Sequence, residues 1–218
     1  MKALLLGSIG TLADTSELQR QAFNDAFREH GLDWHWERDE YRYMLRTSGG
    51  TRRIAAQAEA EDAIVDADAV HATKSRRFQE LLSDGAAEPR PGVPDLIARA
   101  RAEGVKLGFV TTTSAENVST LLSGLDIDRG AFDVVVTRGD VAAPKPAPDC
   151  YLHAADRLGI ATGDCLAVED NVDGARAAMA AGMTCLAWPN GNTQGHDFGA
   201  ARPVEGDIGR AVWAEAAS

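Results

Sequence analysis

Short apolar runs alternate with amphipathic stretches along most of this chain. Five of the runs have the length and composition of strands that are buried on both faces. They are Ala3–Leu6, Leu107–Val110, Val134–Val136, Leu166–Val168 and Cys185–Trp188. Between them, apolar residues recur at three- and four-residue spacings typical of helices, as in Val93, Leu96, Ile97 and Ala100, in Val118, Leu121, Leu122 and Leu125, and in Tyr151, Ala154, Ala155 and Leu158. This alternation predicts a doubly wound, Rossmann-like α/β core with a parallel sheet, whose ligand crevice lies beyond the carboxyl ends of the strands.

Residues 15–88 break the alternation, because they contain helical patterns and no buried strand. The helical patterns lie around Leu18–Phe27, Tyr41–Leu45, Ile54–Ala58 and Phe78–Leu82. We therefore expect a helical cap domain over 15–88, inserted into an α/β core domain made of 1–14 and 89–218. The proline-rich segment that begins at Glu88 stiffens the return to the core.

The net charge of −11 makes nucleic acids and anionic membranes poor partners, since both require clusters of Lys and Arg. A small phosphorylated metabolite remains compatible, because a few local cations and helix N-termini can hold one phosphate. Neither a signal peptide nor an apolar stretch of membrane-spanning length is evident, and the three cysteines lack CxxC spacing. We expect a monomeric, cytoplasmic protein with buried thiols.

Three segments that follow predicted strands contain residues suited to phosphate and metal chemistry. Thr111 ends the strand in GFVTTTS, where a hydroxyl and free backbone N–H groups are good phosphate donors, although Thr113 or Ser114 could simply cap the next helix. Lys145 lies between prolines in APKPAPD, which orients one cation, although a solvated loop lysine explains the same pattern.

Glu169 and Asp170 form an adjacent acidic pair after the strand Leu166–Val168. Two carboxylates at a strand end form a hard oxygen site that suits Mg²⁺. The alternative is that they only favour the N-terminus of the following helix electrostatically.

The order GTLADT, cap, TTTS, APKPAPD and EDNxxG resembles that of the haloacid dehalogenase superfamily, in particular its CbbY-like and β-phosphoglucomutase-like branch with a helical C1-type cap. The resemblance covers nearly the whole chain and implies a Mg²⁺-dependent phosphatase. It assigns phosphate binding to Thr111, Thr112 and Lys145, and metal binding to Glu169 and Asp170. It also suggests cap residues that contact the distal end of the substrate, namely Glu17, Arg20, Arg42, Gly49, Gly50 and Arg53. Asn171 departs mildly from the family pattern, which usually has Ser there.

The first family motif, Asp-x-Asp-Gly-Thr-Leu, is broken in this sequence. The corresponding segment is Gly7-Ser8-Ile9-Gly10-Thr11-Leu12. The resemblance implies that the first Asp attacks phosphorus and binds Mg²⁺, and that the second is the general acid and base. Gly7 provides no nucleophile, and Ile9 cannot transfer the proton, a step that typically contributes about 10²–10⁴-fold to the rate.

Two nearby residues are possible replacements for the lost nucleophile. Strand alternation should turn Ser8 away from the substrate, and we expect Asp14 to cap the first cap helix. We therefore expect a catalytically impaired member of the family that keeps a site for phosphate or a phosphorylated sugar and a weakened Mg²⁺ site.

The alternative is an active Mg²⁺-dependent sugar-phosphate phosphatase with an unconventional nucleophile. β-Phosphoglucomutase-like isomerisation is less favoured, because it needs the aspartyl phosphate even more directly. Haloalkanoate dehalogenation is excluded by the same missing Asp.

Overall fold

The computed structural model describes residues 1–217 and contains one six-stranded sheet in which all neighbouring strands are parallel. The strand order is β3-β2-β1-β4-β5-β6. The strands are β1 (Ala3–Gly7), β2 (Lys106–Val110), β3 (Val134–Val136), β4 (Cys165–Glu169), β5 (Thr184–Ala187) and β6 (Arg202–Pro203). The predicted α/β class and the five predicted strands are confirmed. Sequence reasoning missed β6, because this two-residue edge strand is exposed and has no apolar run.

The sheet is buried on both faces by side chains that alternate along each strand. On one face, Leu4 and Leu6 of β1 pack into a cluster with Phe109 and with the helices α6, α7 and α10. On the other face, Ala3 and Leu5 pack with α8 and α9. This double burial explains why the strands are continuous apolar runs. The helices of this part are α1 (Ile9–Leu12), α6 (Val93–Ala102), α7 (Ala115–Gly124), α8 (Asp149–Leu158), α9 (Val172–Ala180) and α10 (Ile208–Ala216), with short 3₁₀ helices at Arg129–Ala131, Arg138–Asp140 and Thr162–Asp164.

The strand order reverses direction between β1 and β4. From β1 the chain moves outward to β2 and β3, and it then returns to place β4 on the other side of β1. Leu6 of β1 lies opposite Val168 of β4, so the two strands end side by side at Gly7 and Glu169. In open parallel sheets such a reversal point opens a crevice at the carboxyl ends of the strands, where ligands bind.

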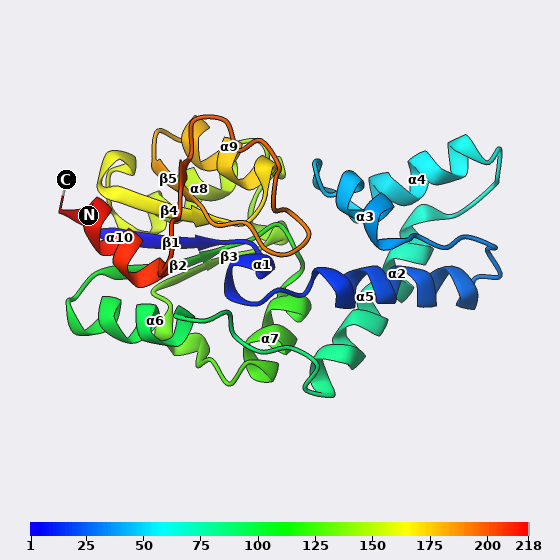
Figure 1. The fold of residues 1–218 in the computed structure, drawn as a ribbon, viewed down its shortest axis with the longest axis horizontal. Coiled ribbons are helices and arrows are strands. Elements are labelled where there is room, and N and C mark those ends of the chain that lie inside the picture. The colour runs from blue at the N-terminus through cyan, green and yellow to red at the C-terminus, as the bar shows by residue number, and fades with distance from the viewer. Residues whose placement is uncertain (218) are drawn as a thin grey trace.

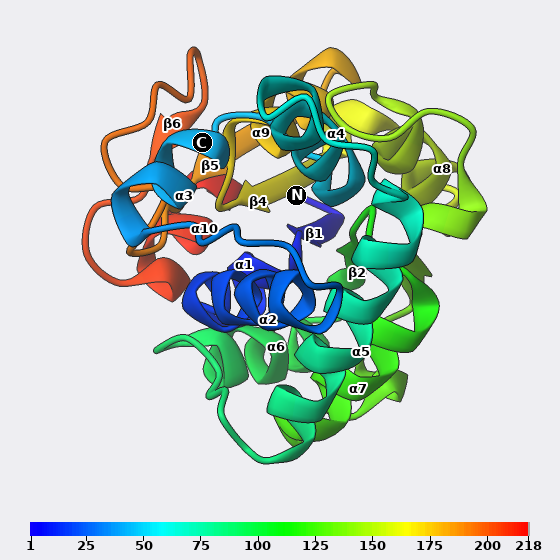
Figure 2. The same ribbon diagram turned by 90° about the vertical axis from the view of Figure 1, so that its right-hand side faces the viewer.

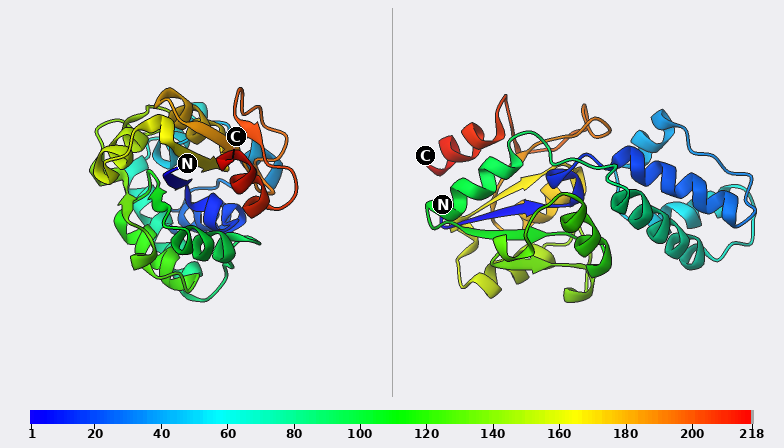
Figure 3. Two further views of the ribbon diagram at one scale, coloured as in Figure 1. Left: turned by 90° about the vertical axis from the view of Figure 1, so that its left-hand side faces the viewer. Right: turned by 90° about the horizontal axis from the view of Figure 1, so that it is seen from below.

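Four further helices lie together beyond this edge of the sheet (Figure 1). They are α2 (Ser16–Glu29), α3 (Arg38–Met44), α4 (Gly50–Ala60) and α5 (Ala67–Ser83). Their own aromatic cluster contains Phe23, Phe27, Trp36 and Tyr41, whereas Phe78 and Leu82 at the end of α5 join the main core. Figure 2 shows these helices in front of the sheet, and Figure 3 places both termini at the opposite end of the molecule.

Within residues 1–217, no helix is both long enough and apolar enough to cross a lipid bilayer. The three cysteines are buried and unpaired, as predicted for Cys165 and Cys185. That residues 15–88 form a cap domain separate from the core domain stays a prediction.

Candidate active site

A cavity of about 660 Å³ lies between the carboxyl ends of the strands and the helices α2, α4 and α5. Its volume is that of a site for a small molecule. Its lining contains five Lys and Arg residues and one carboxylate, that of Asp170; the cations are Arg52, Arg53, Lys74, Arg138 and Lys145. In a protein with a net charge of −11, this local excess of positive charge favours an anionic ligand.

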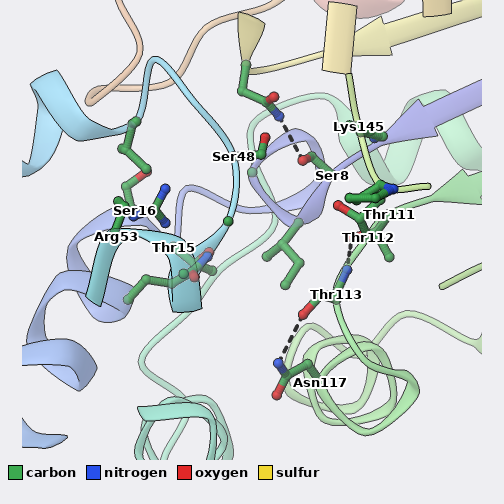
Figure 4. A pocket seen from close by; sticks show the side chains of 18 of the residues that line it. Ser8, Thr15, Ser16, Ser48, Arg53, Thr111, Thr112, Thr113, Asn117 and Lys145 are labelled. Atoms are coloured by element: carbon green, nitrogen blue, oxygen red, sulfur yellow. Dashed lines mark hydrogen bonds between the residues drawn. The ribbon is translucent and has the colours of Figure 1, made fainter. Parts of the chain in front are cut away.

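The core end of the cavity contains the predicted phosphate-binding residues. Thr111 to Ser114 form the loop after β2, and Lys145 lies beside Thr111 (Figure 4). The Thr111 hydroxyl accepts a hydrogen bond from the Thr113 N–H at 3.2 Å, and the Ser114 side chain caps α7. Ser114 therefore caps the helix, as the alternative interpretation of this segment predicted. Thr111 and Thr112 still line the cavity.

Lys145 is buried and pairs with a carboxylate inside the protein. Its ammonium donates to Glu169 Oε1 at 2.6 Å and to the carbonyl oxygen of Val110 at 2.9 Å. Burial alone would lower the pKa of Lys145, but the negative charge of Glu169 keeps that pKa above its usual value. The lysine thus retains its charge and balances Glu169 before any ligand binds.

The Glu169 carboxylate fills the space that a side chain at position 7 would need. A Cβ atom built on Gly7 would lie 2.2 Å from Glu169 Oε1 and 2.2 Å from the Tyr151 hydroxyl oxygen. The Tyr151 hydroxyl donates to Glu169 Oε1 at 2.7 Å, which holds both groups in place. A Cβ atom on Gly174 would also lie 2.1 Å from the Glu169 carboxylate carbon. Glu169 is therefore enclosed between two glycines, and it does not line the cavity.

Asp170 does line the cavity, and protein donors already cover both of its oxygens. Oδ1 faces the Thr11 hydroxyl at 3.4 Å and the Asn171 amide nitrogen at 3.2 Å, and Oδ2 accepts from Asn190 Nδ2 at 2.9 Å. Burial and the nearby Glu169 charge raise the pKa of Asp170 to about 7.

The residues of the broken first motif differ in their surroundings. At position 9, Ile9 lines the cavity and also packs in the main hydrophobic cluster, so the place of the second Asp is apolar. Ser8 lines the cavity, contrary to the expectation from strand alternation. The reason is local: β1 ends at Gly7, and Ser8 turns the chain into α1 with a φ of 66°, where strand alternation no longer applies. Figure 4 shows Ser8 facing the cavity, with its Oγ accepting from Asn171 Nδ2 at 2.8 Å.

Asp14 lies outside the cavity lining. Its Oδ1 accepts from the Ser16 N–H and hydroxyl at the start of α2, and its Oδ2 accepts from the Gly191 N–H at 3.0 Å. Asp14 thus hydrogen-bonds to the start of the first cap helix, but the N-cap residue is Thr15 and not Asp14 as predicted. The same carboxylate also holds the loop after β5.

As they are arranged, these residues do not fit the Mg²⁺ ion that the fold family implies. Mg²⁺ prefers six oxygen ligands in near-octahedral geometry. Glu169 is neutralised by Lys145, and Asp170 faces three donor groups. Within residues 1–217 no group of three or more His, Cys, Asp or Glu side chains is arranged to hold a metal ion.

The far end of the cavity lies on α2, α4 and α5 and is cationic. Of the six predicted cap residues, Gly49, Gly50 and Arg53 line it. Arg53 donates to the Thr47 carbonyl oxygen at 2.9 Å, but its buried Nε has no partner among the described residues. Figure 4 shows Arg53 across the cavity from Ser8 and Lys145.

The other three predicted cap residues, Glu17, Arg20 and Arg42, do not line the cavity, because each is held elsewhere. Glu17 accepts from Arg20 Nε and from Asn192 Nδ2, at 2.9 and 2.8 Å, and Arg20 also donates to the Trp36 carbonyl oxygen. Arg42 reaches the Gln194 carbonyl oxygen at 3.4 Å. These side chains connect the helices to the loop after β5.

Sequence reasoning missed Lys74 and His71 on α5, which line the cavity beside Arg53. Lys74 is almost fully buried, donates to Gln19 Oε1 at 2.8 Å, and lies over the rings of Phe23 and Phe78. Burial and the Arg53 charge lower the pKa of Lys74 to about 7. The one available signal was a lysine four residues before Phe78, on the apolar face of a helix.

Sequence reasoning also missed Asn190 and Thr193, in the loop after β5, which line the core side of the cavity. Arg90 holds this loop by donating to the carbonyl oxygens of Trp188 and Pro189 at 2.8 and 2.9 Å. No periodic pattern in the sequence predicts these contacts, because they join a loop to a distant segment.

Comparison with known proteins places this architecture in one family. Residues 1–182 match the family model described as haloacid dehalogenase-like hydrolase. The CbbY protein of Rhodobacter capsulatus is 41% identical over 209 residues, which cover 92% of this chain and 91% of that protein. The crystal structure of CbbY from Rhodobacter sphaeroides in complex with phosphate is 38% identical, has a TM-score of 0.87, and is matched over 94% of this chain and 93% of that one.

A second crystal structure of the Rhodobacter sphaeroides protein contains a mutant of CbbY in complex with xylulose-(1,5)-bisphosphate, again at 38% identity, with a TM-score of 0.87 and the same coverage. Hydrolases of this family generally use Mg²⁺. The family model and the full-length similarity agree with the parallel six-stranded sheet and its surrounding helices. The chain belongs to the haloacid dehalogenase-like hydrolase family, in its CbbY-like branch.

Proposed function

We propose that this protein binds a sugar that carries a phosphate group at each end and that it is impaired in hydrolysing it. The observation that carries the proposal is the charge of the cavity, which has cations at both ends and a single carboxylate. Lys145 and the Thr111 loop form the core end, and Arg53 and Lys74 form the far end. The bisphosphate in the related Rhodobacter sphaeroides protein supports the same ligand class.

The expected impairment of hydrolysis follows from the residues at positions 7 and 9. No carboxylate projects from position 7 or 9, and the space above Gly7 is filled by Glu169 and Tyr151. Phosphoryl transfer to Asp requires an in-line nucleophile. The absence of the two acids removes negative charge that would repel a phosphate. Phosphate binding is therefore expected to persist although hydrolysis is impaired.

Calorimetry and a phosphate-release assay test the two halves of this proposal separately. We expect a sugar bisphosphate to bind more tightly than the corresponding monophosphate, and orthophosphate to bind most weakly, with no release of phosphate above background. Absence of binding by all three compounds at millimolar concentration would refute the binding half. Release of phosphate by the parent protein at the rate of an intact CbbY would refute the impairment.

One observation favours a second candidate, an active phosphatase with Ser8 as nucleophile. Ser8 lies at a sharp strand-to-helix turn, has a positive φ and lines the cavity. A strained serine in such a turn is the geometry of some hydrolase nucleophiles. The candidate predicts phosphate release that disappears in Ser8→Ala and persists in Ser75→Ala, and a mass increase of one phosphoryl group on intact protein during turnover.

A further inference from the structure

The Asn171 amide group lies where three oxygen atoms of the core end converge. Its Nδ2 donates to Ser8 Oγ at 2.8 Å, to Glu169 Oε2 at 3.1 Å and to Asp170 Oδ1 at 3.2 Å. Asn171 itself lines the cavity. Convergence of several oxygens, two of them anionic, is the environment that a bound cation normally occupies in proteins.

The orientation of this amide is fixed by the backbone. Asn171 is the N-cap of α9, and its Oδ1 accepts a hydrogen bond from the Gly174 N–H at 2.8 Å. Because Oδ1 must face that N–H group, Nδ2 must face the three oxygens. Asn190 is fixed in the same way: its Oδ1 accepts from the N–H groups of Asn192 and Thr193, so its Nδ2 points to Asp170.

The hydrogen-bonding capacity of the two acids is therefore satisfied inside the protein. Lys145 balances Glu169 in a pair that is fully buried. Two amide groups and the Thr11 hydroxyl surround Asp170. Buried carboxylates are stable when they are paired and hydrogen-bonded in this way, and no oxygen of either acid is left without a donor.

We propose that the Asn171 amide group takes the place of the divalent cation, so that this site holds its phosphoryl ligand without a metal. The inference rests on the proposed function for the ligand, but its claim about metal binding stands separately. It makes Asn171 a positioning residue: its amide orders Ser8 and the two acids beside the phosphate-binding loop.

The isosteric variant Asn171→Asp tests the inference directly. It replaces the donating NH₂ group by an oxygen, while the other carboxylate oxygen still accepts from Gly174 N–H and an Asp remains a good N-cap. We expect this variant to bind Mn²⁺, measured by loss of the free-ion electron paramagnetic resonance signal, about 10-fold or more tightly than the parent. The control Asn117→Asp makes the same chemical change at α7, where the Asn117 side chain hydrogen-bonds to Thr113 and Gln79, and is expected to gain nothing.

The second measurement follows orthophosphate binding by calorimetry with EDTA or with Mg²⁺. The parent should give the same affinity in both, whereas Asn171→Asp should bind phosphate only with Mg²⁺. Asn171→Ser adds no charge and replaces the Asp variant in this test if that variant does not fold. Its affinity for orthophosphate should fall in EDTA, and Mg²⁺ should restore that affinity.

Two results would overturn the inference. One is a parent protein that binds Mn²⁺ as tightly as Asn171→Asp does; the other is Asn171→Ser with phosphate binding that is unchanged and independent of Mg²⁺. If no variant binds phosphate at all, the proposed function fails, while the Mn²⁺ titration still decides whether the amide has replaced the cation.

Discussion

At the scale of single residues, Gly7 is a position with no room for a side chain. The nearest atoms belong to Glu169 and Tyr151; the Glu169 carboxylate accepts hydrogen bonds from both the Tyr151 hydroxyl and Lys145. Inserting a side chain into such a packed region forces shifts in its neighbours. Restoring Asp at positions 7 and 9 alone is therefore not expected to rebuild the active site.

Gly7→Ala is expected to lower the free energy of unfolding by about 1–3 kcal/mol, because one methyl group overlaps two buried oxygens. Urea denaturation measures the effect. Gly163→Ala, in an exposed 3₁₀ helix with no atom near the added Cβ, is the matched control and should change little.

A double-mutant cycle with Tyr151→Phe tests the cause. Removing the hydroxyl gives the new methyl group room, so the double variant should be more stable than the sum of the two single effects implies. Strict additivity would show that the Tyr151 hydroxyl does not limit the space at position 7.

At the scale of elements, the apolar periodicity predicted the strands well because parallel strands are buried on both faces. It predicted the end of β1 poorly at Ser8, where the backbone leaves the strand with a positive φ. The Thr111 loop and Lys145 were found because they follow strands whose ends must meet at one edge. Lys74 and Asn190 were missed because their partners come from distant segments, and no spacing along the chain encodes such contacts.

Helix α5 brings a titratable cation to the cavity in Lys74, and this predicts a pH dependence of binding. With a pKa of about 7 in the free protein, Lys74 is mostly neutral at about pH 8. A bound anion favours the charged form and raises this pKa. Binding at that pH should therefore take up a proton, and the affinity should fall as the pH rises above about 7.

Calorimetry of sugar bisphosphate binding in buffers of different ionisation enthalpy measures this uptake. Lys74→Met keeps the apolar stem between Phe23 and Phe78 and should reduce the uptake, leaving the part that belongs to Asp170, whose pKa is also about 7. Lys106→Met, at an exposed ion pair outside the cavity lining, should leave it unchanged. Equal proton uptake in the parent and Lys74→Met would assign the proton to another group.

At the scale of the whole molecule, the helices α2 to α5 join the core through the apolar end of α5 and also through a few polar contacts near the strand ends. The Ser48 N–H, before α4, donates to Asp173 of α9 at 2.7 Å. Asn192 in the loop after β5 contacts both Glu17 and Arg38. Closing contacts of this kind bias the equilibrium between closed and open arrangements.

Asp173→Ala removes one such contact and should shift the protein toward an open arrangement. We expect a larger radius of gyration by small-angle X-ray scattering without ligand, a return toward the parent value with ligand, and weaker binding, since closure must then be driven by the ligand. Asp128→Ala, at the start of the 3₁₀ helix Arg129–Ala131, is the control. A parent-like radius and affinity for Asp173→Ala would mean that this contact does not hold the helices closed.

The enclosure of Glu169 between Gly7 and Gly174 also bears on how this lineage can evolve. A change of Gly7 to the Asp of the family motif meets occupied space, so it is expected to destabilise the fold before it can provide a nucleophile. A prior change at Tyr151 or Glu169 would make room, but on its own it disrupts a buried ion pair or hydrogen bond. Under the proposed function, each single step is thus expected to lower stability without a gain in activity, which makes Gly7 difficult to reverse one residue at a time.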